Sequence, residues 1–227
     1  MKKPIKIRVM KRIFAFCTIL TLCLTSCITV TQKIATGPIE ERTIAIPEGV
    51  VALAMSSGFD VKVDSTLPSG EIRVTTHTDM FDRLDIGVEQ STLNIGMKSH
   101  RLRAKVLEVR IPALRYETIA VSGGVDFEWQ GCNVEALTVA ASGGADLMIE
   151  GECKSLMLAA SGGADAELSR LRAENVEVAA SGGADVEVCA LNTLSVNASG
   201  GADVEYEGTP SVKNINRSGG AEVSAKN

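Results

Sequence analysis

The sequence is poor in the residue types on which most binding and catalytic sites depend. Only 4% of the 227 residues are aromatic, and the only histidines are His77 and His100. Because sugar-binding modules expose aromatic rings for stacking, this composition does not favour that class, and Phe127, Trp129 and Tyr206 have the alternation of core residues. No Cys-x-x-Cys or Cys/His spacing indicates a zinc or dithiol site. We expect each histidine to be a surface residue rather than a general base.

Positive charge is scarce in the part of the chain that follows residue 26. Six of the 23 basic residues and none of the 28 acidic residues precede Cys27, so the rest of the chain carries 17 basic and 28 acidic residues, a net charge of −11. Residues 28–121 are nearly balanced, with 11 basic and 12 acidic residues, whereas residues 122–227 have 6 and 16. Nucleic-acid binding needs a basic surface, so we expect no nucleic-acid partner.

The first 26 residues have the pattern of a secretory signal peptide. Several Lys and Arg residues precede an apolar run from Ile13 to Leu24, which is too short to span a bilayer comfortably. The run ends in Leu24-Thr-Ser-Cys27, which resembles the lipobox of bacterial lipoproteins, so Cys27 is the predicted lipidation site. An uncleaved anchor helix and an unlipidated secreted product are the alternatives.

Lipidation at Cys27 would hold the chain at a membrane without a spanning segment, because two or more acyl chains anchor stably. Ile28 follows the cysteine instead of aspartate, and by resemblance to lipoprotein sorting rules this favours the outer membrane; the leaflet is left open. Residues 27–41 then form the lipidated cysteine and its tether. A basic cluster, residues 98–105, is compatible with a solvated hairpin or with contact to anionic glycans or lipid head groups.

One five-residue phrase, Ser-Gly-Gly-Ala-Asp or a close variant, is repeated six times. Its serines are separated by steps of 20, 19, 20, 18 and 19 residues and lie at Ser122, Ser142, Ser161, Ser181, Ser199 and Ser218. A fixed period near 20 residues is typical of a solenoid, in which each coil buries its apolar face against the next. The Gly-Gly pair predicts a corner between two short strands.

Alternation around each corner predicts which side chains face the lumen. Val176, Val178 and Ala180 share one parity before the corner, and Val186 and Val188 share another after it. We therefore predict an all-β fold, a right-handed parallel β-helix or β-solenoid with coils of about 20 residues.

The region before the repeats is β-rich but out of phase with them. Alternation predicts strands near residues 43–46, 50–54, 60–63, 71–75, 93–97 and 106–111. Ser57-Gly-Phe-Asp is a degenerate copy of the repeated phrase. We predict one domain over residues 42–227, in which residues 42–121 form an irregular β part that caps the solenoid.

Three cysteines remain after Cys27. Cys132 and Cys153 lie on consecutive predicted coils, so a disulfide between them is one possibility, and burial of Cys132, Cys153 and Cys189 as small apolar side chains is the other. An odd number cannot pair completely.

The aspartates of the repeated phrase are the candidate site. They occupy one repeat position, so we expect them to stack in a column: Asp126, Asp146, Asp165, Asp185 and Asp203, with Glu222 at the end. Glu128, Glu167, Glu187 and Glu205 form a second column, interrupted by Met148. Like charges in neighbouring strands repel, so the column either binds cations, with Ca²⁺ as a structural ion, or caps the corners by accepting backbone N–H bonds.

The sequence resembles the family described as putative auto-transporter adhesin, head GIN domain. The resemblance covers residues 42–217 and rests on Ser57-Gly-Phe-Asp-Val, the Val109-Arg-Ile-Pro segment leading into Ile119-Ala-Val-Ser-Gly-Gly, and the Ser-Gly-Gly-Ala-Asp repeats. It implies a β-helix similar to pectin lyases, no catalytic set, and adhesion at the cell envelope. No separate translocating β-barrel is recognisable, so a literal autotransporter is not expected.

Three classes of function fit these observations. The first is a non-enzymatic, lipid-anchored envelope protein, an adhesin or scaffold with a protein or glycan partner. The second is a pectin-lyase-like enzyme acting on acidic polysaccharide, for which Arg170 and Arg172 are the nearest candidates; however, a catalytic site needs unequal environments, and every coil here repeats the same carboxylates. The third is a periplasmic sensing or regulatory module.

Overall fold

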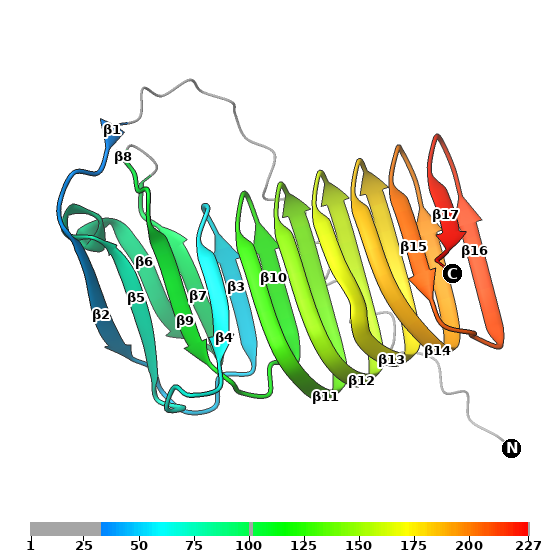
Figure 1. The fold of residues 1–227 in the computed structure, drawn as a ribbon, viewed down its shortest axis with the longest axis horizontal. Helices are drawn as coiled ribbons and strands as arrows, with labels where there is room; N and C mark the ends of the chain where they lie inside the picture. Colours follow the sequence, from blue (N-terminus) through cyan, green and yellow to red (C-terminus); the bar gives the residue numbers. More distant parts are fainter. Residues whose placement is uncertain (1–32, 100–101, 227) are drawn as a thin grey trace, which may run out of the picture. The chain divides into compact units, whose positions relative to one another are not determined.

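The fold is built almost entirely from β-strands. A computed structural model describes residues 33–99 and 102–226 (Figure 1). All of these residues belong to one compact unit. Strands account for 69% of the described residues and helix for 3%. The predicted signal peptide, Cys27 and His100 lie outside the described residues. Within the described part, no helix is long and apolar enough to cross a membrane.

The repeats form the predicted solenoid, with about five turns spaced about 20 residues apart. Each coil pairs in parallel with the next, and in the middle of the stack one strand element follows nearly a whole coil (Figure 1). The strands of the repeat block are β10 (Thr118–Ser122), β11 (Asp126–Gly143), β12 (Asp146–Gly162), β13 (Asp165–Gly182), β14 (Asp185–Ala198), β15 (Asp203–Glu207), β16 (Val212–Arg217) and β17 (Glu222–Ala225).

The lumen is filled by the side chains that alternation predicted. Val178 and Val188 are fully buried, and the three aromatic residues of the repeat block, Phe127, Trp129 and Tyr206, are buried as well. Because each coil has two open faces, burial comes mainly from the coils above and below it. The prediction that these aromatic rings belong to the core is confirmed.

The Ser-Gly-Gly corner requires glycine at its first glycine position. Gly182 has φ +78°, and a Cβ there would lie 3.0 Å from the backbone N and O of Gly162 in the preceding coil. The next glycine donates its N–H to the corner below, as Gly183 N to Gly162 O at 2.7 Å and Gly201 N to Gly182 O at 2.7 Å. These bonds hold successive corners in register.

The three cysteines are buried and free. The register pairs Cys132 with Gly151 and Cys153 with Val134, because a bulge shifts the pairing after Trp129. Of the two possibilities the sequence left open, burial as apolar side chains is therefore the one the structure shows. Burial raises the pKa of Cys132 to about 12 and that of Cys153 to about 11, which keeps both thiols protonated at neutral pH.

The part before the repeats forms an additional coil and an antiparallel cap. The coil consists of β3 (Ala52–Ser56) and β4 (Asp60–Asp64), which pair in parallel with β10 and β11. The cap elements are β2 (Ile39–Ala45), β5 (Glu71–His77), η1 (Thr78–Arg83), β6 (Leu84–Glu89), β7 (Thr92–Met97) and β9 (Leu107–Pro112). Strands β2, β5 and β9 pair antiparallel on one side, and β6 and β7 do so on the other.

The fold begins earlier than residue 42, where the sequence placed its start. Strand β1 (Lys33–Ile34) pairs in parallel with β8 (Leu102–Arg103), and β2 starts at Ile39. The later part of the predicted tether is thus attached to the cap by main-chain pairing that the sequence pattern does not reveal.

His77 is buried, so the expectation of a surface histidine was wrong for this residue. It is 8% exposed, its Nδ1 lies 2.6 Å from Gly37 O, and its Nε2 has no hydrogen-bond partner among the described residues. Alternation along β5 fails at its end, where Thr76 and His77 are both buried, because segment 33–38 crosses the strand there.

The final coil differs from the others at its lumen positions. Lys213 and Arg217 occupy the register positions of buried Leu194 and Ala198 in β14, and all six residues of β16 are exposed. The Lys213 ammonium lies 5.6 Å from the Tyr206 ring centroid. Inward-pointing charges of this kind protect an open sheet edge from pairing with another chain.

Candidate functional site

The repeat aspartates stand in register, as predicted. Strand pairing places Asp126 beside Asp146, and the same register continues through Asp165, Asp185 and Asp203 to Glu222. In the other direction, Asp60 pairs with Asp126 and with Glu108 of β9. The acidic column, as we call it, comprises Glu108, Asp60, Asp126, Asp146, Asp165, Asp185, Asp203 and Glu222. Neighbouring carboxylates in such a stack are about 4.8 Å apart along the strand-pairing direction.

The column carboxylates do not cap the corners. Within residues 33–99 and 102–226, no backbone N–H donates a hydrogen bond to a side chain of the acidic column. The corner N–H groups are used between coils instead, and the N–H of each column aspartate donates to the coil before it, as Asp165 N does to Ala145 O at 2.9 Å. The capping interpretation is therefore not supported, and the repulsion within the column remains uncompensated by the turns.

A second column of carboxylates lies beside the first. Lysine side chains form ion pairs with it at its two ends but not in its middle. Lys62 Nζ lies 3.0 Å from Glu128 Oε2 at one end, and Lys226 Nζ lies 2.7 Å from Glu187 Oε1 at the other. Met148 interrupts the column, as predicted, and pairs with Glu167. Among the described residues, Glu167 makes no ion pair.

A shallow groove of about 350 Å³ follows both columns from Asp60 to Glu167. Partial burial, with the neighbouring Asp146 and Asp60 carboxylates, raises the pKa of Asp126. Partial burial and the surrounding carboxylates, Glu167 first, raise the pKa of Asp165 in the same way. In the part of the chain that the structure describes, no lysine or arginine forms an ion pair with a carboxylate of the acidic column.

The geometry gives the calcium interpretation no direct support. Among the residues that the structure describes, no group of three or more His, Cys, Asp or Glu side chains is placed to hold one metal ion. Column members on successive coils line up in a row instead of converging on one point, which suits an extended partner better than a single ion.

Charges on another side of the same coils are arranged in the opposite way. At the corner seven residues before the serine of each Ser-Gly-Gly phrase, Lys154 Nζ lies 2.7 Å from Glu135 Oε1. This pair lowers the pKa of Glu135, to which Arg115 contributes, and Glu174 acts on Lys154 from the following coil. Arg115, Glu135, Lys154 and Glu174 form the alternating corner, in which every charge has neighbours of the opposite sign. It lines a groove of about 450 Å³.

The remaining candidate residues do not converge on a site. Arg170 is exposed and its Nη1 lies 2.7 Å from Glu150 Oε1, while Arg172 pairs in register with Glu152. Neither arginine borders the acidic groove. The lyase-like arginines of the sequence interpretation are therefore surface residues on the outside of the solenoid.

Sequence reasoning missed two parts of this arrangement. Asp60 was recognised as part of a degenerate repeat but not as a column member, and Glu108 has no repeat signal at all. The alternating corner does have a signal, because its members lie seven residues before Ser122, Ser142, Ser161 and Ser181.

A comparison with protein families matches one of them. Residues 51–210 match the family described as "Putative auto-transporter adhesin, head GIN domain", and a search of curated proteins found no match. Among solved structures, a putative adhesin from Bacteroides fragilis NCTC 9343 has a TM-score of 0.69 at 18% identity, covering 85% of this chain and 99% of that one.

Two further solved structures share the fold at lower similarity. A putative lipid binding protein from Parabacteroides distasonis ATCC 8503 has a TM-score of 0.53 at 16% identity, covering 86% of this chain and 100% of that one. A putative adhesin from Parabacteroides merdae ATCC 43184 has a TM-score of 0.51 at 10% identity, covering 87% and 100%. At these identities the likeness shows the fold alone. With the family match covering most of its length, the chain belongs to the putative auto-transporter adhesin, head GIN domain family.

Proposed function

We propose that this protein is a non-enzymatic, lipid-anchored adhesin of the cell envelope that contacts its partner through the acidic column. The partner surface is a protein or glycan carrying fixed positive charge or bound divalent cations. The lipid on Cys27 holds the protein at the outer membrane, and the solenoid is a rigid support that keeps the carboxylates in a row.

The observation that carries this proposal is that the negative charges of the acidic column are not paired with positive ones. Carboxylates in register repel one another, and partial burial together with this repulsion raises the pKa values of Asp126 and Asp165. The same coils place opposite charges side by side in the alternating corner. An uncompensated row has a physical use when a cationic partner covers it, because the partner then removes the repulsion as well as adding its own attraction.

The uniformity of the row supports a non-enzymatic role. A general acid and a general base need environments that push their pKa values apart, whereas the pKa values of Asp126 and Asp165 are shifted in the same direction.

The adhesion test compares two sets of three substitutions that change the net charge equally. The first set, Asp146→Asn, Asp165→Asn and Asp185→Asn, removes the centre of the acidic column. The matched control, Glu135→Gln, Glu152→Gln and Glu174→Gln, removes three carboxylates from the groove that the alternating corner lines. Cells displaying each variant at equal surface density are measured for attachment to amine-coated and calcium-treated anionic surfaces.

The proposal predicts that the column set reduces attachment by roughly tenfold, while the corner set leaves it within about twofold, because only the column faces the partner. Equal losses for the two sets, or no loss for either, would remove the acidic column from the function. Lipidation is tested separately, by incorporation of labelled palmitate into the wild type and its loss in Cys27→Ser.

A further inference from the structure

The place where the chain enters the fold bears on how the solenoid stands at a membrane. Lys33, the first described residue, is six positions after Cys27, and an extended chain of this length spans about 20 Å. If Cys27 carries the lipid, strand β1 therefore stays within that distance of the bilayer surface. This step rests on the lipid anchoring proposed above.

The entry segment is fixed to one corner of the cap by four polar contacts. Ala35 N donates to Arg103 O at 2.8 Å, Thr36 N to Asp79 Oδ2 at 3.2 Å and Thr78 N to Pro38 O at 2.9 Å. The fourth joins the ring of buried His77 to Gly37 O. A Cβ on Gly37 would also collide with Thr78 Oγ1, so the segment is packed tightly against η1. The attachment point is thus defined by the fold and does not slide along the solenoid.

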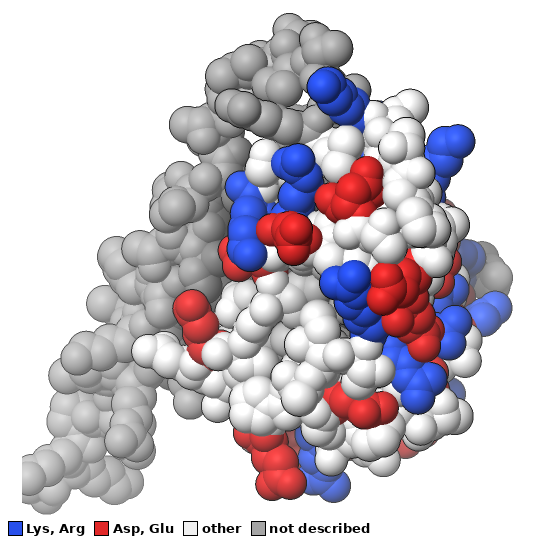
Figure 2. All heavy atoms as spheres, turned by 90° about the vertical axis from the view of Figure 1, so that its left-hand side faces the viewer, with Lys and Arg blue, Asp and Glu red and all other residues white. Residues whose placement is uncertain are grey.

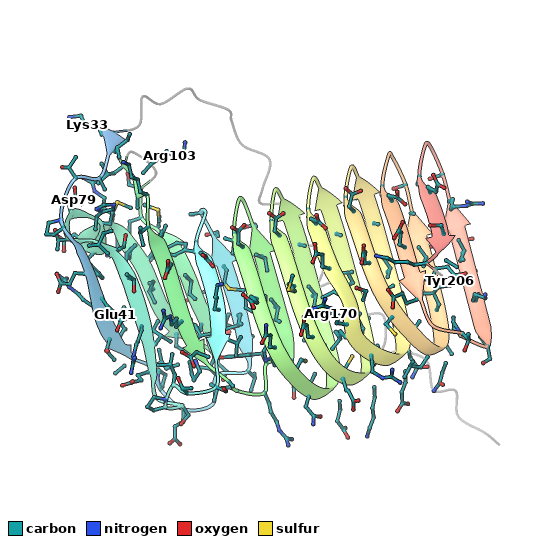
Figure 3. All side chains as sticks on the ribbon, in the orientation of Figure 1. Lys33, Glu41, Asp79, Arg103, Arg170 and Tyr206 are labelled. Carbon is teal, nitrogen blue, oxygen red and sulfur yellow. The ribbon has the colours of Figure 1, made fainter. Side chains whose placement is uncertain are left out.

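The surface at this corner suits lipid head groups. Lys33, Arg103 and Lys105 are exposed, and Ile34, with 59% of its surface exposed, follows Lys33 in β1 and pairs with Arg103 of β8. Asp79 is a neighbouring carboxylate, and Lys33, Arg103 and Lys105 contribute three positive charges to the corner. Figure 3 shows Lys33 and Arg103 together at one end of the solenoid, with Asp79 nearby. Basic side chains beside an exposed aliphatic one are favourable at an anionic lipid surface.

The cap as a whole does not oppose this contact, whereas the repeat block does. Figure 2 looks onto the cap end, where Lys/Arg and Asp/Glu side chains are interspersed. The sequence is nearly neutral over residues 28–121 but has 16 acidic and 6 basic residues over 122–227. An anionic membrane therefore attracts the corner and repels the repeats. Both effects favour an orientation in which the cap faces the membrane and the repeats point away from it.

We propose that the cap corner, formed by Lys33, Ile34, Arg103 and Lys105, rests on the anionic head groups of the anchoring membrane and that the repeat coils extend away from it. The outermost coil is then β16 and β17. Ten strands pair successively from β2 to β17 on one side of the solenoid, which corresponds to about 43 Å at 4.8 Å per step. The acidic column runs along this direction, so on an upright solenoid its carboxylates face sideways, in a row that rises from the membrane.

The test is neutron reflectometry of the lipoprotein in supported bilayers of phosphatidylethanolamine with phosphatidylglycerol, compared with neutral phosphatidylcholine. An upright solenoid gives a protein layer about 45 Å thick, and a flat one gives roughly half of that. The first variant pair is Lys33→Glu with Arg103→Glu. The matched control, Lys213→Glu with Arg217→Glu, makes the same charge change on the final coil.

We expect the wild type and the control to form the thick layer on the anionic bilayer, and the corner variant to form a thinner, broader one. A flat wild-type layer, or no effect of the corner variant, would overturn the proposal. Should palmitate labelling show that Cys27 is not lipidated, the proposed anchoring fails, and the same measurement on the chain coupled through Cys27 to a maleimide lipid still tests the corner.

Discussion

The acidic column and the alternating corner are built from the same coils, yet their charges follow opposite rules. In the corner, Glu135 and Lys154 pair across neighbouring coils at 2.7 Å, and each charge meets its opposite. In the column, Asp146, Asp165 and Asp185 meet only carboxylates along the stack. The corner shows that this chain can compensate charge between coils, so the column is not an unavoidable result of repetition. The difference supports our proposal that an outside partner covers the column.

The largest expected effect concerns the turns that hold both regions in register. Gly182→Ala forces a side chain into φ +78° against the backbone of Gly162, so we expect a loss of about 2 kcal/mol or more in the free energy of unfolding. Gly183→Ala is the control, since its Cβ would meet Gly162 O at an ordinary 3.7 Å and its φ is not positive. Thermal unfolding checks both, and an equal loss at the two positions would show that the left-handed corner is not what sets the register.

A smaller loss is expected when the alternation of the corner is broken. Lys154→Glu places three carboxylates in succession where Glu135 and Glu174 now flank a cation. The melting temperature should fall by about 2 °C at low ionic strength, and the loss should shrink in high salt. Lys154→Gln should lie between the two. Insensitivity of the Lys154→Glu variant to salt would mean that the corner pairs carry no electrostatic stabilisation.

The opposite sign is expected in the column. Asp165→Asn removes one of several repelling carboxylates, so the melting temperature should rise by about 1 °C at pH 7. Because the pKa of Asp165 is raised in the folded state, its charged form destabilises the fold above that pKa, and the penalty disappears as pH falls below the unfolded value. The advantage of Asp165→Asn should therefore vanish at acidic pH. A destabilising Asp165→Asn at pH 7, with the effect dependent on calcium, would instead indicate a bound cation.

The repeated regions could be predicted from the sequence because every coil repeats the same phrase at the same offset. That periodicity alone sets the lumen residues and the register from Asp126 to Glu222. The cap could not be predicted in the same way, since its antiparallel pairs have no repeat to align them. His77 shows the consequence, because its burial depends on segment 33–38 crossing the end of β5.

Within the candidate site, the limits of prediction have specific causes. Glu108 joins the column only because β9 pairs with β4, which no sequence period indicates. Cys132 and Cys153 looked close by coil number, but the bulge after Trp129 places Cys132 opposite Gly151. A bulge adds a residue to one coil without adding a coil. The distance in sequence from the repeat serine therefore does not give the pairing partner of a residue beyond the bulge.

The most direct test of the contrast between the two regions is NMR titration of the side-chain carboxyls of Asp126, Asp165 and Glu135 in one sample. Our account predicts that Asp126 and Asp165 titrate above 3.8 and Glu135 below 4.5, the ordinary values of their side chains. Addition of a cationic partner should lower the pKa values of the two aspartates and leave that of Glu135 unchanged. If Asp126 and Asp165 titrate at or below 3.8 without any partner, the column is already compensated, and the central claim is wrong.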